Sequence, residues 1–99
     1  MFCIKIHEKF GVKILAICDI DVIDKEFEYR GVKLKVSKDF YFERTVNQNE
    51  LLSLISNESF NVINAFGKNV VNLLIEKGLI SEKNILIIDG QKHAILQIL

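Results

Sequence analysis

Near the carboxyl end of the chain lies the stretch Ile85-Leu-Ile-Ile-Asp-Gly-Gln-Lys-His-Ala-Ile-Leu-Gln-Ile-Leu99. Residues 85–88 are all isoleucine or leucine, and apolar positions return between residues 93 and 99. Asp89-Gly90 stands between the two runs, and this pair tolerates the positive φ angles of a two-residue turn. The stretch therefore predicts an antiparallel hairpin.

A second hairpin is predicted at the amino end of the chain, where residues 2–7 and 12–18 are rich in β-forming residues. In the register that sets Cys3 opposite Ala16, Cys3 and Cys18 lie diagonally across the pair, roughly 7 to 8 Å apart. That separation is too long for a disulfide without backbone movement. We therefore expect two free thiols.

A third hairpin follows, in which residues 25–29 and 32–36 are joined by Arg30-Gly31. Its alternation sets apolar side chains on one face. The opposite face carries two cross-strand pairs of opposite charge, Glu28 with Lys33 and Glu26 with Lys35.

Two helices are predicted between the last two hairpins. Asn47 and Glu50 form a capping-box pattern in front of a short helix near residues 48–56. Residues 68–77 are apolar on all but a narrow stripe, which is typical of a buried helix. Gly78 is placed to supply the left-handed residue that ends this second helix.

These elements predict an α+β fold, in which antiparallel β-hairpins form one or two small sheets and both helices pack on one face. The order of the hairpins in the sheet stays open. A chain of 99 residues has room for one hydrophobic core. We therefore expect a single domain over residues 1–99.

Charge and composition narrow the classes of partner. Thirteen basic and thirteen acidic residues give a net charge of zero, so no global field attracts DNA or an anionic membrane. The chain is 49% hydrophobic, yet no uninterrupted apolar run approaches the roughly 20 residues that span a bilayer. We expect a cytoplasmic protein with neither DNA nor a membrane as partner, whose RNA contact, if any, is a local patch.

Four short motifs stand in order along the chain: Ala16-Ile-Cys-Asp19, Phe40-Tyr41, Asn64-Ala-Phe-Gly67 and His93-Ala94. Together they resemble a small archaeal family catalogued as domain-of-unknown-function family 424. The chain departs from that pattern at Lys92, where the family has proline, and at Phe42-Glu43-Arg44, where small residues and glycine are usual.

The resemblance implies an archaeal source, a single α+β domain and genes that often lie beside translation genes, with no established activity. It marks seven family-motif positions: Cys18, Asp19, Phe40, Tyr41, Asn64, Gly67 and His93.

Cys18, Asp19 and His93 are the residue types of a thiolate nucleophile with a base and an orienting carboxylate. Against a catalytic role, Cys18 is expected inside an apolar sheet, where a thiol is inert. Asp19 has a structural explanation as the cap of the turn over residues 20–23, or as a hydrogen-bond partner of His93. We therefore expect no catalytic residues and keep this trio as the alternative.

Metal and cofactor sites are not predicted. The two cysteines and two histidines lack any Cys-x-x-Cys or His-x-x-x-His spacing. Cys3 and His7 share a predicted strand and would lie about 13 Å apart, too far to share one zinc ion. No cofactor-binding motif is present.

The stretch Arg30–Arg44 is the main candidate for a binding surface, because it interleaves five basic residues with three consecutive aromatic ones at 40–42. Lys33 and Lys35 face glutamates in the predicted hairpin, and one or two of the aromatic rings should enter the core. The residues expected to contact RNA or another partner are Lys38, Tyr41 and Arg44, together with Lys68.

Asn64 and Gly67 precede the buried helix, whose first amides could receive a phosphate or carboxylate. The preferred interpretation is that Asn64 caps that helix or a turn, and that Gly67 permits close packing or a positive φ. A run of acidic residues should form a solvated face: Asp19, Asp21, Asp24, Glu26 and Glu28.

The leading hypothesis is a non-catalytic binding module of the archaeal translation apparatus that contacts the ribosome or its RNA through the basic and aromatic patch. Two alternatives stay open. One is a small enzyme dependent on Cys18 or His93. The other is a protein-interaction subunit without an RNA role, suggested by apolar residues on the second sheet face around Val12, Ile14 and Ala16.

Overall fold

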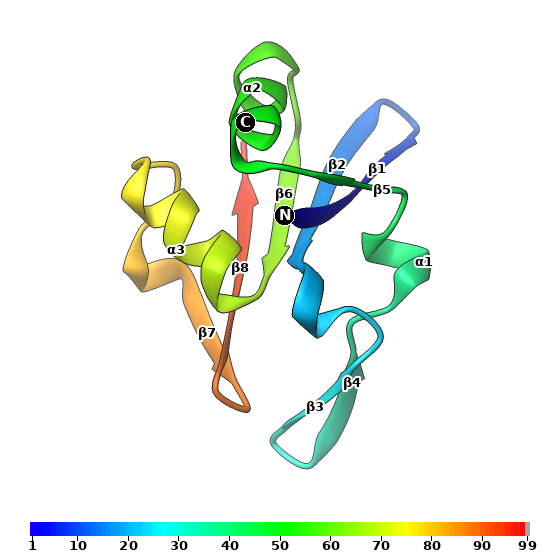
Figure 1. The fold of residues 1–99 in the computed structure, drawn as a ribbon, viewed down its shortest axis with the longest axis vertical. Coiled ribbons are helices and arrows are strands. Elements are labelled where there is room, and N and C mark those ends of the chain that lie inside the picture. The colour runs from blue at the N-terminus through cyan, green and yellow to red at the C-terminus, as the bar shows by residue number, and fades with distance from the viewer. Residues whose placement is uncertain (99) are drawn as a thin grey trace.

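The computed structural model describes residues 1–98, which form a six-stranded sheet, a two-stranded sheet and three α-helices (Figure 1). The large sheet has the order β5-β1-β2-β6-β8-β7, and β3 pairs with β4. The strands are β1 Phe2–Lys9, β2 Val12–Asp19, β3 Glu26–Tyr29, β4 Val32–Lys35, β5 Arg44–Val46, β6 Val62–Phe66, β7 Ile85–Ile88 and β8 Gln91–Gln97. The helices are α1 Lys38–Tyr41, α2 Gln48–Asn57 and α3 Lys68–Glu76, with short 3-10 turns at Ile20–Val22 and Glu82–Asn84.

The predicted α+β class is therefore confirmed. Leu99, the last residue of the expected final strand, lies outside the described residues. Within residues 1–98, no helix is both long enough and apolar enough to cross a membrane.

All three predicted hairpins are present, each closed by a two-residue turn. In each turn a non-glycine residue and a glycine both adopt positive φ, at Phe10-Gly11, Arg30-Gly31 and Asp89-Gly90. This backbone geometry matches the right-handed twist of the flanking strands. The predicted pairs of Glu28 with Lys33 and Glu26 with Lys35 are found in the register of β3 and β4.

The predicted register of the first hairpin is wrong. The strands continue to Lys9 and Val12, because the tight turn needs only two residues. Cys3 consequently lies opposite Cys18 instead of Ala16. The two cysteines are direct cross-strand neighbours, and both are buried free thiols.

The sequence prediction missed β6, a central strand that pairs in parallel with β2 and antiparallel with β8. This strand has only five residues of mixed polarity, so the sequence pattern does not indicate a strand there. Asn64 lies in the middle of this strand, so the expectation that it caps a helix or turn is wrong. α1 and β5 were missed for the same reason, since they have four and three residues.

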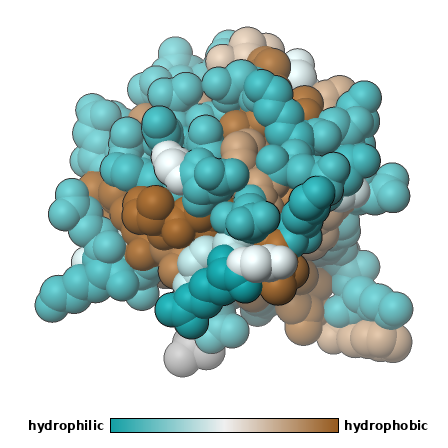
Figure 2. All heavy atoms as spheres, turned by 90° about the horizontal axis from the view of Figure 1, so that it is seen from below, coloured by the Kyte–Doolittle hydropathy of each residue, from teal (hydrophilic) through white to brown (hydrophobic). Residues whose placement is uncertain are grey.

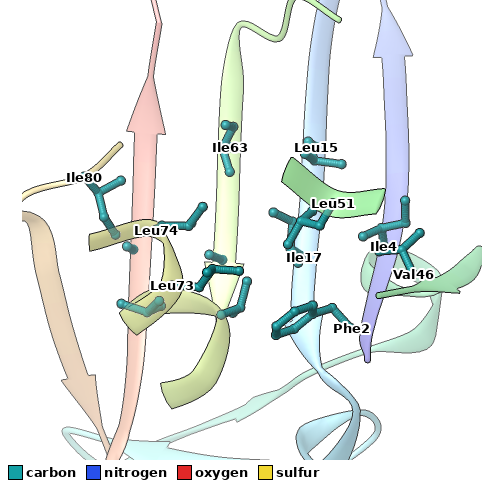
Figure 3. Close-up of a cluster of buried hydrophobic side chains, with 14 of the residues drawn as sticks. Phe2, Ile4, Leu15, Ile17, Val46, Leu51, Ile63, Leu73, Leu74 and Ile80 are labelled. Atoms are coloured by element: carbon teal, nitrogen blue, oxygen red, sulfur yellow. The ribbon is translucent and has the colours of Figure 1, made fainter. Parts of the chain in front are cut away.

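Both longer helices cover one face of the large sheet and enclose the main core, as predicted (Figure 3). The capping box is present, because Asn47 Oδ1 accepts from the Glu50 amide and Glu50 Oε1 accepts from the Asn47 amide. α3 ends at Glu76, and Gly78 adopts the expected positive φ of 71°. The largest fully buried side chains of this core are Ile4, Leu15, Ile17, Leu51, Ile63 and Leu74.

The opposite face of the sheet is only partly covered. α1 and the β3–β4 hairpin pack over one end of it, where a smaller cluster includes Cys18, Val36, Tyr41, Phe66 and Ile88. Further along the face, apolar side chains reach solvent, with Val12, Leu86 and Ile95 each 41 to 49% exposed. Figure 2 views the end of the molecule that carries the β3–β4 and β7–β8 turns, and shows hydrophobic surface between polar side chains.

Candidate functional site

A cavity of about 280 Å³ opens on the partly covered face. Its floor belongs to the sheet and consists of Asn64 and Phe66 of β6, Ile88 of β7 and His93 of β8. Its outer wall comes from one chain segment, residues 34–41, through Leu34, Lys35, Val36, Phe40 and Tyr41. Aromatic and aliphatic walls with a few polar groups are the usual composition of a ligand site.

Hydrogen bonds fix the outer wall at two points, one at the turn residue Asp24 and one at strand β1 of the sheet. The Asp24 amide donates to the Val36 carbonyl oxygen over 2.7 Å. His7 Nε2 donates to the Phe40 carbonyl oxygen over 2.8 Å, and the His7 ring stacks on the Phe40 ring with centroids 4.7 Å apart. The chain's own groups therefore hold Val36 and Phe40 in the wall.

Three polar side chains from three elements meet at Asn64. Tyr41 Oη donates to Asn64 Oδ1 over 2.6 Å, and His93 Nε2 lies 3.1 Å from the same oxygen. An amide oxygen only accepts, so the His93 Nε2 atom carries the hydrogen of this bond. Asn64 Oδ1 thereby uses both of its acceptor positions, and Asn64 joins α1 to β8 through β6.

Burial keeps both partners of Asn64 uncharged. It raises the pKa of the Tyr41 phenol, because the phenolate would lose its hydration. It lowers the pKa of His93 below 6.5 for the same reason. At neutral pH the cluster of Tyr41, Asn64 and His93 therefore offers hydrogen bonds instead of charge.

Asp19 and Gly67 form a structural joint on the other side of the sheet. Asp19, only 4% exposed, accepts from the Asn69 and Val70 amides at 2.9 Å each and so caps α3. A Cβ on Gly67 would lie 2.4 Å from Asp19 Cγ, and Gly67 also has a φ of 126°. Burial raises the pKa of Asp19, and the two backbone hydrogen bonds oppose that rise.

Three expectations change with this joint. Asp19 caps α3 and makes no side-chain hydrogen bond in the turn over residues 20–23, which it was expected to cap. Its carboxylate accepts hydrogen bonds from α3 and not from His93. The Asn69 and Val70 amides of α3 are occupied by Asp19, so these two amides are not open to a phosphate. The close-packing role expected of Gly67 is confirmed.

The proposed catalytic trio is not assembled. Cys18 is fully buried, and burial raises its thiol pKa, which disfavours the thiolate. Cys18 and His93 each pair with Phe66 from opposite sides, so they lie two strands, or roughly 10 Å, apart. The Asp19 carboxylate is hydrogen-bonded to α3 on the other face of the sheet. Within residues 1–98, no group of three or more potential ligand residues is placed to hold a metal ion.

The residues expected to contact RNA do not form one surface. Tyr41 is 7% exposed and lines the cavity, and exposed Lys38 begins the same helix, α1. Arg44 borders a shallow groove beside α2, and Lys68 is the first residue of α3. The four residues therefore divide between the cavity side and the helix-covered side.

Several smaller expectations are met on the cavity side. Among the three consecutive aromatic residues, Tyr41 is buried, Phe40 is half-buried and Phe42 is 42% exposed, as the limited room in the core implies. The acidic run is solvated at Asp21, Asp24, Glu26 and Glu28, whereas Asp19 is buried.

Five of the lining residues were not predicted as members of a site: Leu34, Lys35, Val36, Phe66 and Ile88. Lys35 was assigned to a pair with Glu26, but its Nζ lies 4.0 Å from Asp24 Oδ1. These residues come from three strands, β4, β6 and β7, and a linker, so no local pattern could group all of them. Four of the family-motif residues, Phe40, Tyr41, Asn64 and His93, do converge here, and hydrogen bonds join the last three.

Known proteins resemble this chain in sequence and in fold. The family model "Protein of unknown function (DUF424)" matches residues 7–99. A solved structure described as an uncharacterized conserved protein from Methanopyrus kandleri is 26% identical, with a TM-score of 0.79 over 99% of this chain and 91% of that one. No curated protein matches the sequence. Because the family model spans nearly the whole sequence, the chain belongs to the DUF424 family.

Proposed function

We propose that this protein is a non-catalytic, cytoplasmic binding module of the archaeal translation apparatus, and that it contacts single-stranded RNA of the ribosome or another ribonucleoprotein. The observation that supports this most directly is the aromatic-lined cavity beside exposed lysines. Lys35 lines the cavity, and Lys38 begins the helix that supplies Phe40 and Tyr41 to the cavity wall.

Single-stranded RNA is bound by aromatic surfaces that take the bases and by cations that take the phosphates. Both kinds of group occur together on the partly covered face. The chain has no net charge, so phosphate contact must come from such a local cluster.

Lys35 and Lys38 are available to bind a phosphate. Lys35 Nζ and Lys38 Nζ lie 4.0 and 3.7 Å from the carboxylate of Asp24, and all three side chains are about half exposed. Ion pairs at such exposed positions contribute little. A phosphate can therefore replace the Asp24 carboxylate at small cost.

A matched pair of charge reversals tests the proposal. Lys35→Glu with Lys38→Glu changes the cavity side, and Arg44→Glu with Lys68→Glu makes the same change in net charge elsewhere. Binding of a labelled, mixed-sequence single-stranded RNA is measured by fluorescence anisotropy across a salt series. Co-sedimentation with ribosomal particles at low and high salt provides the second measurement.

The cavity-side variant should bind RNA about tenfold more weakly at low salt, and its salt slope should fall by roughly 0.7 for each phosphate that the two lysines neutralise in the wild type. The control variant should bind like wild type. Equal binding by all three proteins, or no binding by wild type, would overturn the RNA proposal.

A protein-interaction role is the second candidate, and the exposure of Val12, Leu86 and Ile95 on the same face favours it. It predicts that Ile95→Asp abolishes co-sedimentation with ribosomal particles and leaves the affinity for free RNA unchanged. A nucleophilic role for Cys18 has no support in this geometry, because its thiol is buried away from Asp19 and His93.

A further inference from the structure

We infer, on the basis of the RNA contact proposed above, that the cavity behind residues 34–41 accepts one unstacked nucleobase, which hydrogen-bonds to the Asn64 amide nitrogen and His93 Nδ1. The base would enter between the outer wall and the sheet, with its ribose and phosphate left at the mouth near Lys35.

The size of the cavity limits the occupant to one ring system. Its volume of about 280 Å³ lies just below the usual range for small-molecule sites, which is roughly 300 to 1,000 Å³. A dinucleotide or a large cofactor would not fit. A single planar base would fit, and the Phe40 and Phe66 rings provide apolar walls for it.

The free polar atoms indicate what kind of ring is suitable. Tyr41 and His93 occupy Asn64 Oδ1, so within residues 1–98 the Asn64 Nδ2 group has no protein acceptor and His93 Nδ1 no protein donor. No fully buried side-chain nitrogen or oxygen in this part of the chain lacks a partner, so both atoms reach open space. Together they present one donor and one acceptor to an occupant.

The Watson–Crick edge of every nucleobase carries a donor next to an acceptor, and can therefore satisfy both atoms at once. An aromatic side chain of a protein partner is the rival occupant. A phenylalanine ring would leave Asn64 Nδ2 and His93 Nδ1 unpaired, which opposes its binding. Lys35 at the wall further favours a ligand that carries phosphate.

The probes for a test are the four ribonucleoside 5′-monophosphates, ribose 5-phosphate as the same ligand without a base, and N-acetyl-tyrosinamide as the aromatic side chain. Binding to the full chain is measured by amide chemical shifts in NMR titrations. Leu34→Trp places a large ring at the wall of the cavity. Val32→Trp is the matched control, because Val32 is exposed on the same strand and does not line the cavity.

At least one nucleotide should shift the resonances of Asn64, Phe66 and His93 saturably, and ribose 5-phosphate should not. Leu34→Trp should weaken that binding by at least about tenfold, as expected when a stacked base is excluded, and Val32→Trp less than about twofold. Asn64→Leu should weaken it similarly, with retained secondary structure checked by circular dichroism.

Three results would overturn the base-binding inference: equal shifts with ribose 5-phosphate, no effect of Leu34→Trp, or tighter binding of N-acetyl-tyrosinamide than of any nucleotide. If RNA affinity depends on Lys35 and Lys38 but not on Leu34→Trp, the cavity inference fails and the RNA proposal stands. If nucleotides bind but the charge reversals leave RNA affinity unchanged, the RNA proposal fails alone.

Discussion

The two faces of the large sheet are built from the same strands and differ in almost every physical property. In β6, Ile63 and Ala65 point into the core under the helices, whereas Asn64 and Phe66 line the cavity on the other side. The helix-covered face is sealed and apolar. The opposite face is covered at one end only, by α1 and the β3–β4 hairpin, and it carries polar groups and the cavity. Because side chains alternate along a strand, five residues serve stability on one side and a candidate site on the other.

The largest effect is expected at the joint that fixes α3 on the sealed face. Gly67→Ala should cost about 4 kcal/mol or prevent folding, because the new Cβ would meet the Asp19 carboxylate and the backbone has a positive φ. Gly78→Ala is the control, since its φ is also positive but nothing lies within 4 Å. It should cost only about 1 kcal/mol. Chemical denaturation measures both, and equal costs would contradict the steric role of Asp19.

Truncating one buried side chain on each face compares the two directly. Leu74→Ala, in the sealed core, should lower the free energy of unfolding by about 4 kcal/mol, and Ile88→Ala, beside the cavity, by about 2 kcal/mol. The second loss is smaller because the space around Ile88 is already partly open. Urea unfolding measures both values. A larger loss for Ile88→Ala would mean that the cavity face is packed as tightly as the core.

The cap of α3 can be tested without changing side-chain size. Asp19→Asn should cost about 2 kcal/mol, because two backbone amides need two acceptor oxygens and the new amide group supplies one. Asp21→Asn, at an exposed position two residues later, should change stability by less than about 0.5 kcal/mol. Thermal unfolding of the two variants gives the comparison, and similar Tm values would exclude the cap.

The smallest expected effect is the pH response of the cavity face. Burial lowers the folded-state pKa of His93 below 6.5, so the unfolded chain binds its proton first as the pH falls. Stability from this source is complete above 6.5 and is lost as the pH falls through the folded pKa. Tm measured at about pH 7.5 and about pH 5.5 should therefore differ less in His93→Gln than in wild type. The same difference in both proteins would contradict this assignment.

Local signals in the sequence were sufficient for the hairpins and the two longer helices, and insufficient for the central strand and the cavity. The tight turns, the Asn47 capping box and Gly78 each act within a few residues, so the three hairpins and two helices were predictable. β6 was not, because its position depends on pairing with two distant strands. Tyr41, Asn64 and His93 were each singled out for a different role, and their convergence required the topology. Lys35 was missed because the hairpin register gave it a cross-strand partner that its side chain does not use.

The register of β1 and β2 places Cys3 opposite Cys18. The reactivity of these two thiols can therefore report on local opening of the sheet. Both thiols are 1% exposed or less, so an alkylating reagent can reach them only when the β1–β2 pair or its cover opens. The rate of labelling, followed by mass spectrometry on the unaltered protein, would therefore measure how often this part of the sheet opens. A ligand that fills the neighbouring cavity and suppresses this opening would slow the labelling of both thiols without touching either sulfur atom.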